Sequence, residues 1–174
     1  GTLAAEAERE EMEVYLLTGD RDSLQLITDK TTVLLATNKE TLEMTPAAFK
    51  EKYGVPAENY VYCKALMGDS SDNIPGVPGI GEKTAFKLIA EYGTLDAMYA
   101  ALGDAAIPAG QKAKLEAGKE LAYLSLELAT IKRDAELGFG IKEASEIKRD
   151  NAIKNWLISM IHNWKPDFVG IEGI

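Results

Sequence analysis

The sequence predicts an α/β fold: a small parallel sheet, then a mainly helical region, then a tail helix with a possible strand. Two short apolar segments, 13–19 and 31–37, predict strands, and a loop with a short helix fits between them. A strand–helix–strand unit of this kind favours parallel pairing. After residue 45, helix caps and helix-stopping glycines recur, which predicts the helical region.

The first helices follow from local signals. Residues 2–12 predict a helix, because Ala, Glu and Arg dominate and no helix breaker interrupts them. In "TPAAFKEKYG", Thr45 is expected to cap a helix, Pro46 to occupy its first turn and Gly54 to end it. A further helix is expected to stop at Gly68.

The later helices are marked in the same way. Residues 81–93 predict an amphipathic helix that stops at Gly93. Its apolar face consists of Ala85, Leu88 and Ile89. Thr94 is expected to cap the next helix, "LDAMYAAL", and "AGQKAKLEAGKELAYLSLELAT" is expected to be helical again.

Composition limits the chemistry of the chain. Its 174 residues are enough for one domain with a core, and the single cysteine, Cys63, excludes an internal disulfide and a cysteine-based zinc site. The single histidine, His162, excludes histidine-rich metal sites. No apolar run is long enough to span a bilayer, and the acidic N-terminus is unlike a signal peptide. The cytoplasm is therefore the expected location, with no membrane partner.

The net charge of −9, taken alone, argues against nucleic acid as a partner. The excess is uneven, because residues 1–60 carry −6 and residues 61–174 carry −3. No dense basic run is present. Any binding to DNA would therefore depend on backbone amides, metal ions or a few lysines.

Two pairs of acids stand at informative places. Asp20 and Asp22 follow strand 13–19, and ligand sites in α/β sheets lie beyond the carboxyl ends of strands. Asp69 and Asp72 share a face if they lie in one helical turn. The alternatives are a solvated loop with two surface acids for the first pair, and an N-cap with a turn residue for the second.

Together the two pairs predict a metal site. Carboxylates that converge raise one another's pKa, and a divalent cation relieves their repulsion. Oxygen ligands suit Mg²⁺ or Mn²⁺, with water completing the coordination shell. Such ions support phosphodiester hydrolysis by activating a water molecule and neutralising developing charge. The expected metal-binding and catalytic residues are Asp20, Asp22, Asp69 and Asp72.

The segment "GVPGIGEKTA" predicts a tight hairpin between two helices, with its turn fixed by Pro75 and Pro78. Three glycines, Gly76, Gly79 and Gly81, let the backbone approach a ligand closely. The helix that starts near Glu82 offers free N–H groups to an anion, with Lys83 and Thr84 beside them. This hairpin is expected to hold a DNA backbone without reading bases. A merely structural hairpin with good caps is the alternative.

Three segments carry a resemblance: "LLTGDRDSLQLITD", "ALMGDSSDNIPGVPGIGEKTAFKLIAEYGTLDAMYAAL" and "LAYLSLELATIKRD". They resemble the 5′→3′ exonuclease domain of bacterial DNA polymerase I and, more broadly, the flap-endonuclease superfamily. The resemblance implies a divalent-metal-dependent nuclease acting on duplex DNA with a 5′ end or flap. It also implies roles in DNA replication and repair.

The resemblance assigns roles to individual residues. Acids at the positions of Asp20, Asp22, Asp69 and Asp72 form the family's second metal site. Arg21 and Gln25 are expected near it and are grouped with the DNA-binding residues. The hairpin corresponds to a helix–three-turn–helix element that binds duplex DNA, often with a K⁺ ion held by backbone carbonyls. That surface is expected to consist of Gly76, Val77, Gly79, Ile80, Gly81, Lys83 and Thr84.

The chain also departs from the family. Residues 1–135 are expected to be the C-terminal part of a 5′ nuclease domain, and the family's earlier half would precede residue 1. That half holds a helical arch and the acids of the first metal site. We therefore expect this chain alone to be inactive or weakly active. Ser23 and Leu126 stand where an apolar and a basic residue are expected.

The tail, residues 136–174, is not covered by the resemblance. In it "NAIKNWLISMIHNW" predicts an amphipathic helix and "FVGIEGI" a strand. This unit is weakly similar to the missing first half of the family and to Holliday-junction resolvases of RNase H-like fold, in which an acid at the position of Glu172 binds metal. A packing helix with an edge strand is the alternative.

Three functional hypotheses follow. The leading one is the C-terminal part of a structure-specific 5′ nuclease that binds duplex DNA and a divalent metal. The second is a non-catalytic duplex-DNA-binding module whose acids are remnants. The third is a structural fragment that needs a partner polypeptide for missing strands, because strand 13–19 would otherwise expose an unpaired edge.

Overall fold

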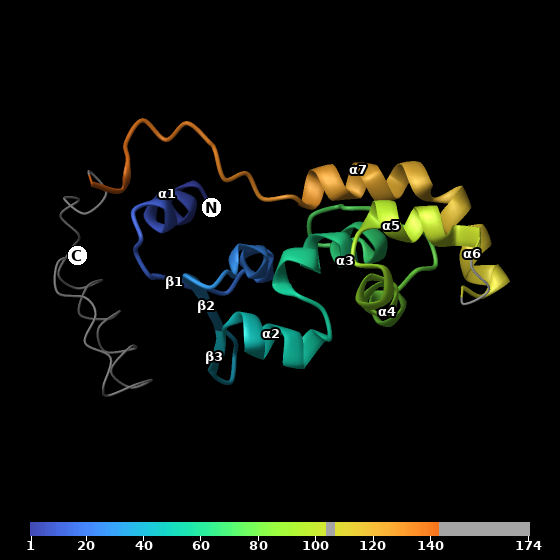
Figure 1. Cartoon of the computed structure of the whole chain (residues 1–174), viewed down its shortest axis with the longest axis horizontal. Helices are drawn as coiled ribbons and strands as arrows, with labels where there is room; N and C mark the ends of the chain where they lie inside the picture. The colour runs from blue at the N-terminus through green and yellow to red at the C-terminus, as the bar shows by residue number, and fades with distance from the viewer. Residues whose placement is uncertain (104–106, 143–174) are drawn as a thin grey trace.

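The computed structural model describes residues 1–103 and 107–142 (Figure 1). The predicted tail helix and strand, with His162 and Glu172, lie outside these residues. The helices and strands, in chain order, are α1 (Thr2–Arg9), β1 (Val14–Thr18), the 3₁₀ turn η1 (Arg21–Leu26), β2 (Thr31–Ala36), β3 (Thr41–Met44), α2 (Pro46–Tyr53), η2 (Ala57–Asn59), α3 (Tyr60–Met67), α4 (Glu82–Tyr92), α5 (Leu95–Ala100), η3 (Ala101–Gly103), α6 (Ala109–Ala117) and α7 (Lys119–Ala129). None of the described helices has the length and apolar character needed to cross a membrane.

The sheet has the strand order β1-β2-β3. The two expected strands pair in parallel, with Leu16 opposite Val33. The expectation of parallel strands alone was incomplete, because β3 pairs with β2 in the antiparallel direction. The reversal between them is held by Thr37, whose hydroxyl donates to the carbonyl of Glu40 at 2.7 Å. Strand β3 was not predicted because it is short and has no run of apolar residues, and the turn before it is stabilised by a side chain.

Strand β1 lies at an edge of the sheet. Within residues 1–103 and 107–142 it has a hydrogen-bonded neighbour strand, β2, on one side only. Its residues are half-buried or exposed, and Tyr15 is 40% exposed. The sequence predicted a buried strand here, and strands of parallel sheets are usually covered on both faces. The structure corrects that prediction to a partly open edge strand.

One continuous core joins the sheet to the helical region. At its centre Phe49 of α2 is fully buried, and its ring centroid lies 4.6 Å from that of Tyr53 and 5.5 Å from that of Tyr60. Tyr53 in turn stacks on Phe86 of α4 at 5.3 Å. Aromatic pairs at these separations pack favourably. The packing holds α2 against α3 and α4.

The helical region confirms most of the predicted caps. The hydroxyl of Thr45 accepts from the amide of Ala48 at 3.2 Å, and Thr94 caps α5 in the same way. The stretch predicted as helical after residue 108 is divided at Gly118 into α6 and α7. A Cβ on Gly118 would lie 2.8 Å from the side chain of Val77. The glycine therefore lets the hairpin pack closely against this junction.

After α7 the chain returns across the molecule toward α1 (Figure 1). Gln25 of η1 holds the start of this segment, because its amide nitrogen donates to the carbonyl of Ala129 at 2.8 Å. Further along, the amide of Ala135 donates to the hydroxyl of Thr2 at 2.9 Å. These bonds tie the end of α7 to η1 and the segment that follows it to α1.

Candidate functional site

The first acid pair lies where β1 ends. The amide of Asp20 donates to the hydroxyl of Thr18 at 3.0 Å, and the carboxylate of Asp20 accepts from the amide of Asp22 at 2.8 Å. Asp20 is therefore the N-cap of η1. This cap places Asp22 in the first turn of η1, facing α3.

The second acid pair follows α3, which ends at Gly68 with a positive φ of 73°. The sequence interpretation of Asp69 and Asp72 as one helical turn is wrong. Asp69 and Ile74 exchange two backbone hydrogen bonds, at 2.9 and 2.8 Å, around a tight turn. The Asp69 carboxylate accepts from the amide of Ser71 at 2.9 Å, a local bond that competes with a helix. The turn nevertheless brings the two acids together.

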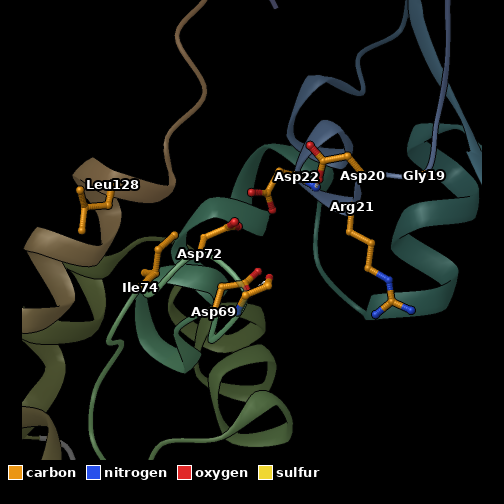
Figure 2. A pocket seen from close by; sticks show the side chains of 9 residues that line it. Gly19, Asp20, Arg21, Asp22, Asp69, Asp72, Ile74 and Leu128 are labelled. Carbon is orange, nitrogen blue, oxygen red and sulfur yellow. Dashed lines mark hydrogen bonds between the residues drawn. The ribbon is translucent and has the colours of Figure 1, made fainter.

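Three of the four predicted acids converge. Asp22, Asp69 and Asp72, hereafter the acid cluster, each offer a carboxylate oxygen, and these oxygens lie within 4.8 Å of one another. They line a pocket of about 520 Å³, and Ile74 and Leu128 line the same pocket (Figure 2). Asp20 lines the same pocket but is outside the group of three. The carboxylate oxygens of the acid cluster are the kind of ligand that a hard divalent cation prefers.

A fourth charged group, missed in the sequence, lies beneath the acids. Lys64 of α3 is 1% exposed, and its ammonium pairs with Asp22 and, at 2.8 Å, with Asp69. The sequence signal was a lone lysine within the apolar helix "VYCKALM". A buried charge requires a partner, and these two carboxylates provide it.

The pairing changes the acidity of Asp69. Its hydrogen bond from Lys64, and then those from Ser71, lower the pKa of Asp69 from 3.8 to about 2. Because the folded pKa is depressed, the carboxylate stabilises the fold above pH 3.8, and this contribution is lost as the pH falls toward about 2. We expect the free energy of unfolding, measured with urea, to fall less for Asp69→Asn than for the parent chain across that pH window. Equal losses in the two proteins would contradict the assigned cause.

The hairpin residues divide into two groups. Val77 and Ile80 were predicted to face DNA, but their side chains are 2% and 3% exposed and belong to the core. Their amides are engaged as well, because that of Val77 donates to the carbonyl of Leu66 at 2.8 Å and that of Ile80 to the carbonyl of Val77 at 3.0 Å. Gly81, Lys83 and Thr84 lie at the start of α4, where no side chain caps the first N–H groups. The amide of Thr84 already donates to the carbonyl of Gly81 at 3.0 Å, so the N–H groups of Glu82 and Lys83 are the ones left without an acceptor in the helix.

The glycines serve different purposes. A Cβ on Gly76 would lie 2.3 Å from the amide nitrogen of Gly68, so Gly76 allows the chain to pass against itself rather than against a ligand. Gly79 lies under Lys114, whose ammonium donates to the Gly79 carbonyl at 3.2 Å. Gly81 has open space around it. Of the three, only Gly81 retains the predicted role of leaving room for a ligand.

The two residues expected near the metal site also differ. Arg21 is exposed and lines the pocket, although its side chain extends away from the acid cluster (Figure 2). Gln25 is 7% exposed, and both ends of its amide are engaged, by Ala129 at the end of α7 and by Ile131 in the segment after it. Gln25 therefore acts as a structural residue in this arrangement, not as a group facing DNA.

Family models match most of the chain. The model described as "5'-3' exonuclease, N-terminal resolvase-like domain" matches residues 1–54, and "5'-3' exonuclease, C-terminal SAM fold" matches residues 55–152. The thermostable DNA polymerase I of Thermus filiformis is 51% identical over 142 residues, 82% of this chain and 17% of the relative. DNA polymerase I of Bacillus subtilis is 47% identical over 140 residues, 79% of this chain and 16% of the relative.

Solved structures give the same result for the fold. A bacteriophage T5 flap endonuclease, in a pseudo-enzyme–product complex with DNA and metal ions, superposes with a TM-score of 0.61 at 28% identity. The match covers 73% of this chain and 46% of that one. A T5 5′-exonuclease with bound zinc has a TM-score of 0.59 at 29% identity, covering 72% of this chain and 47% of that one.

The fold, the acid cluster and these matches assign the chain to the class of metal-dependent 5′–3′ exonucleases and flap nucleases. Within that class, the chain belongs to the 5′–3′ exonuclease family represented in bacterial DNA polymerase I. The chain spans about one sixth of the length of the curated relatives it matches, 17% for the Thermus filiformis protein.

Proposed function

We propose that this chain binds a divalent cation, Mg²⁺ or Mn²⁺, through the acid cluster and duplex DNA through its hairpin. The parent activity is hydrolysis of phosphodiester bonds near a 5′ end or flap. The observation that carries the proposal is the convergence of Asp22, Asp69 and Asp72 from two separate segments, within 4.8 Å. We further propose that residues 1–135 lie within this nuclease part, and the family match continues past them to residue 152.

Each side chain has a physical role in the proposal. Asp22 and Asp72 offer carboxylate oxygens to the ion, and Asp69 does so while fixed by Lys64 and Ser71. Asp20 orients Asp22 by capping η1. A bound ion would supply charge neutralisation at the phosphate and a more acidic water.

The hairpin has the chemistry to hold a phosphate. The N–H groups of Glu82 and Lys83, the first two of α4, have no side-chain cap, and the N-terminal end of a helix favours anions. Lys83 is exposed beside them. Backbone donors carry no base information, so the proposed contact is independent of sequence. A K⁺ ion on hairpin carbonyls remains part of this proposal.

A salt titration tests the DNA contact. We expect Lys83→Ala to weaken binding to a fluorescein-labelled duplex with a 5′ flap, and to reduce the slope of log affinity against log salt by about 1. The measurement is fluorescence anisotropy at several KCl concentrations with Ca²⁺ present. Lys39→Ala, an exposed lysine in the β2–β3 turn, is the matched control. An unchanged slope in Lys83→Ala would contradict the proposed contact.

A non-catalytic DNA-binding module is the second candidate. Among the described residues there is one group of three or more potential metal ligands, whereas hydrolysis with two ions requires ligands for both. Mn²⁺ titration of Asp69→Ala against the parent chain distinguishes the candidates, because the chain alone is expected to be inactive or weakly active. Weaker Mn²⁺ binding by the variant supports the metal site of a nuclease, and equal binding supports the module.

The partly open edge at β1 favours a third candidate, in which another polypeptide adds strands beside it. Light scattering separates this candidate from the first two, because a stable monomer counts against the need for a partner.

A further inference from the structure

Lys64 is an unusual group to find beside a cation site. It is a lysine with 1% exposure, and its ammonium lies between two of the three carboxylates of the acid cluster. A lysine is rarely buried unless its charge is compensated. The proposed divalent ion and the lysine ammonium therefore share the same negative charge.

The lysine connects segments that are distant in the chain. Asp22 belongs to η1, Asp69 to the turn after α3, and Lys64 to α3 itself. The carbonyl of Lys64 accepts from the amide of Gly68 at 2.8 Å, which closes the C-terminal end of α3 just before Asp69. The ammonium thus fixes the separation of the two carboxylates in the absence of any ion.

The hydrogen bonds also distribute the oxygens. The ammonium of Lys64 pairs with Oδ1 of Asp22 and Oδ2 of Asp69. Oδ1 of Asp69 accepts hydrogen bonds from the amide and the hydroxyl of Ser71. Asp72 is exposed and has no ion pair among those found in the described residues. A divalent ion therefore meets one unengaged carboxylate and two that already hold a cation.

We propose that Lys64 is an internal counter-cation of the acid cluster: it pre-forms the site without metal and weakens divalent-cation binding. This inference rests on the metal site of the proposed function. Lys64 lowers the formal charge of the cluster from −3 to −2, since three carboxylates are opposed by one ammonium. A unit charge about 5 Å from a divalent ion changes its affinity by about tenfold even in a water-like dielectric.

Mn²⁺ titration followed by electron paramagnetic resonance tests the proposal. We expect Lys64→Met to bind Mn²⁺ about tenfold more tightly than the parent chain. Lys39→Met is the matched control and should leave the affinity unchanged. Equal or weaker binding by Lys64→Met would overturn the claim that the ammonium weakens cation binding, because a lysine that only organised the site would lower the affinity when removed.

A second comparison covers the case in which Lys64→Met does not fold. The double variant Lys64→Met/Asp22→Asn removes the ammonium and one of its partners together, which often costs little stability. We expect it to bind Mn²⁺ about tenfold more tightly than Asp22→Asn alone. Equal or weaker binding by the double variant would overturn the proposal.

The stability of the metal-free protein tests the structural half separately. We expect Lys64→Met to lower the melting temperature of the metal-free protein. The double variant Lys64→Met/Asp69→Asn should recover part of that loss, because Lys64 and Asp69 are coupled. Additive effects would overturn the pre-forming role of Lys64. If the parent chain binds no Mn²⁺ while this coupling is present, the proposed function fails and the pre-forming role of Lys64 stands.

Discussion

Gly76→Ala is expected to lower the free energy of unfolding by about 3 kcal/mol or more, a combination of backbone strain and overpacking. Gly76 has a φ of 63°, which a side chain disfavours. Its Cβ would lie 2.3 Å from the amide nitrogen and 2.7 Å from the Cα of Gly68. Both neighbours are backbone atoms at the end of α3, so relief requires the hairpin to move. Urea unfolding followed by circular dichroism measures the loss.

Gly81→Ala is the matched control in the same hairpin. Gly81 has a φ of −93° and open space around it, so the added methyl group meets nothing. We expect a change in unfolding free energy within about 0.5 kcal/mol. Comparable losses at the two positions would show that the close passage of Gly76 against Gly68 does not govern the stability of the hairpin.

Asp72→Asn is expected to weaken divalent-cation binding by about 100-fold, since it removes one of three charges that attract the ion. Asp72 is the best residue for this test because it is exposed and makes no ion pair with Lys64 in the described structure. Its replacement should therefore leave folding stability nearly unchanged. Isothermal titration with Mn²⁺ and Mg²⁺ measures the affinity, and urea unfolding checks the fold.

Asp29→Asn provides the comparison for Asp72→Asn. Asp29 is exposed in the turn before β2, outside the pocket that holds the acid cluster. The same chemical change there should leave Mn²⁺ affinity unaltered. If both variants lose affinity equally, the ion is attracted by the general negative charge of the chain rather than by the cluster.

The elements predictable from sequence are those with local causes. Thr45 and Thr94 cap their helices through their own hydroxyls, and Gly54 ends α2 with a φ of 75°. The apolar face of α4, with Leu88 and Ile89 buried, follows from helical spacing alone. The convergence of the acids was also accessible, because the carboxyl end of a strand is where α/β proteins place ligands.

The features that escaped prediction depend on distant partners. Asp69 and Asp72 lie in a turn because Asp69 pairs with Ile74 and bonds to Ser71, a competition that spacing does not reveal. Gly76 is required by the passage of Gly68, eight residues away, which is visible only in three dimensions.

Lys64 was missed for a related reason. Its partner Asp22 is 42 residues earlier in the chain. A lysine in an apolar helix signals a buried charge, but the sequence does not identify the carboxylates that compensate it. The same limit applies to Gln25, whose partner Ala129 is 104 residues later.

Crystals of this chain soaked in Mn²⁺ show through anomalous scattering whether Asp22, Asp69 and Asp72 jointly hold a divalent cation. We expect an anomalous peak in the pocket bounded by these acids, within coordination distance, about 2.2 Å, of their carboxylate oxygens. An ordered pocket with no peak, or a peak bound only elsewhere on the chain, would contradict this expectation.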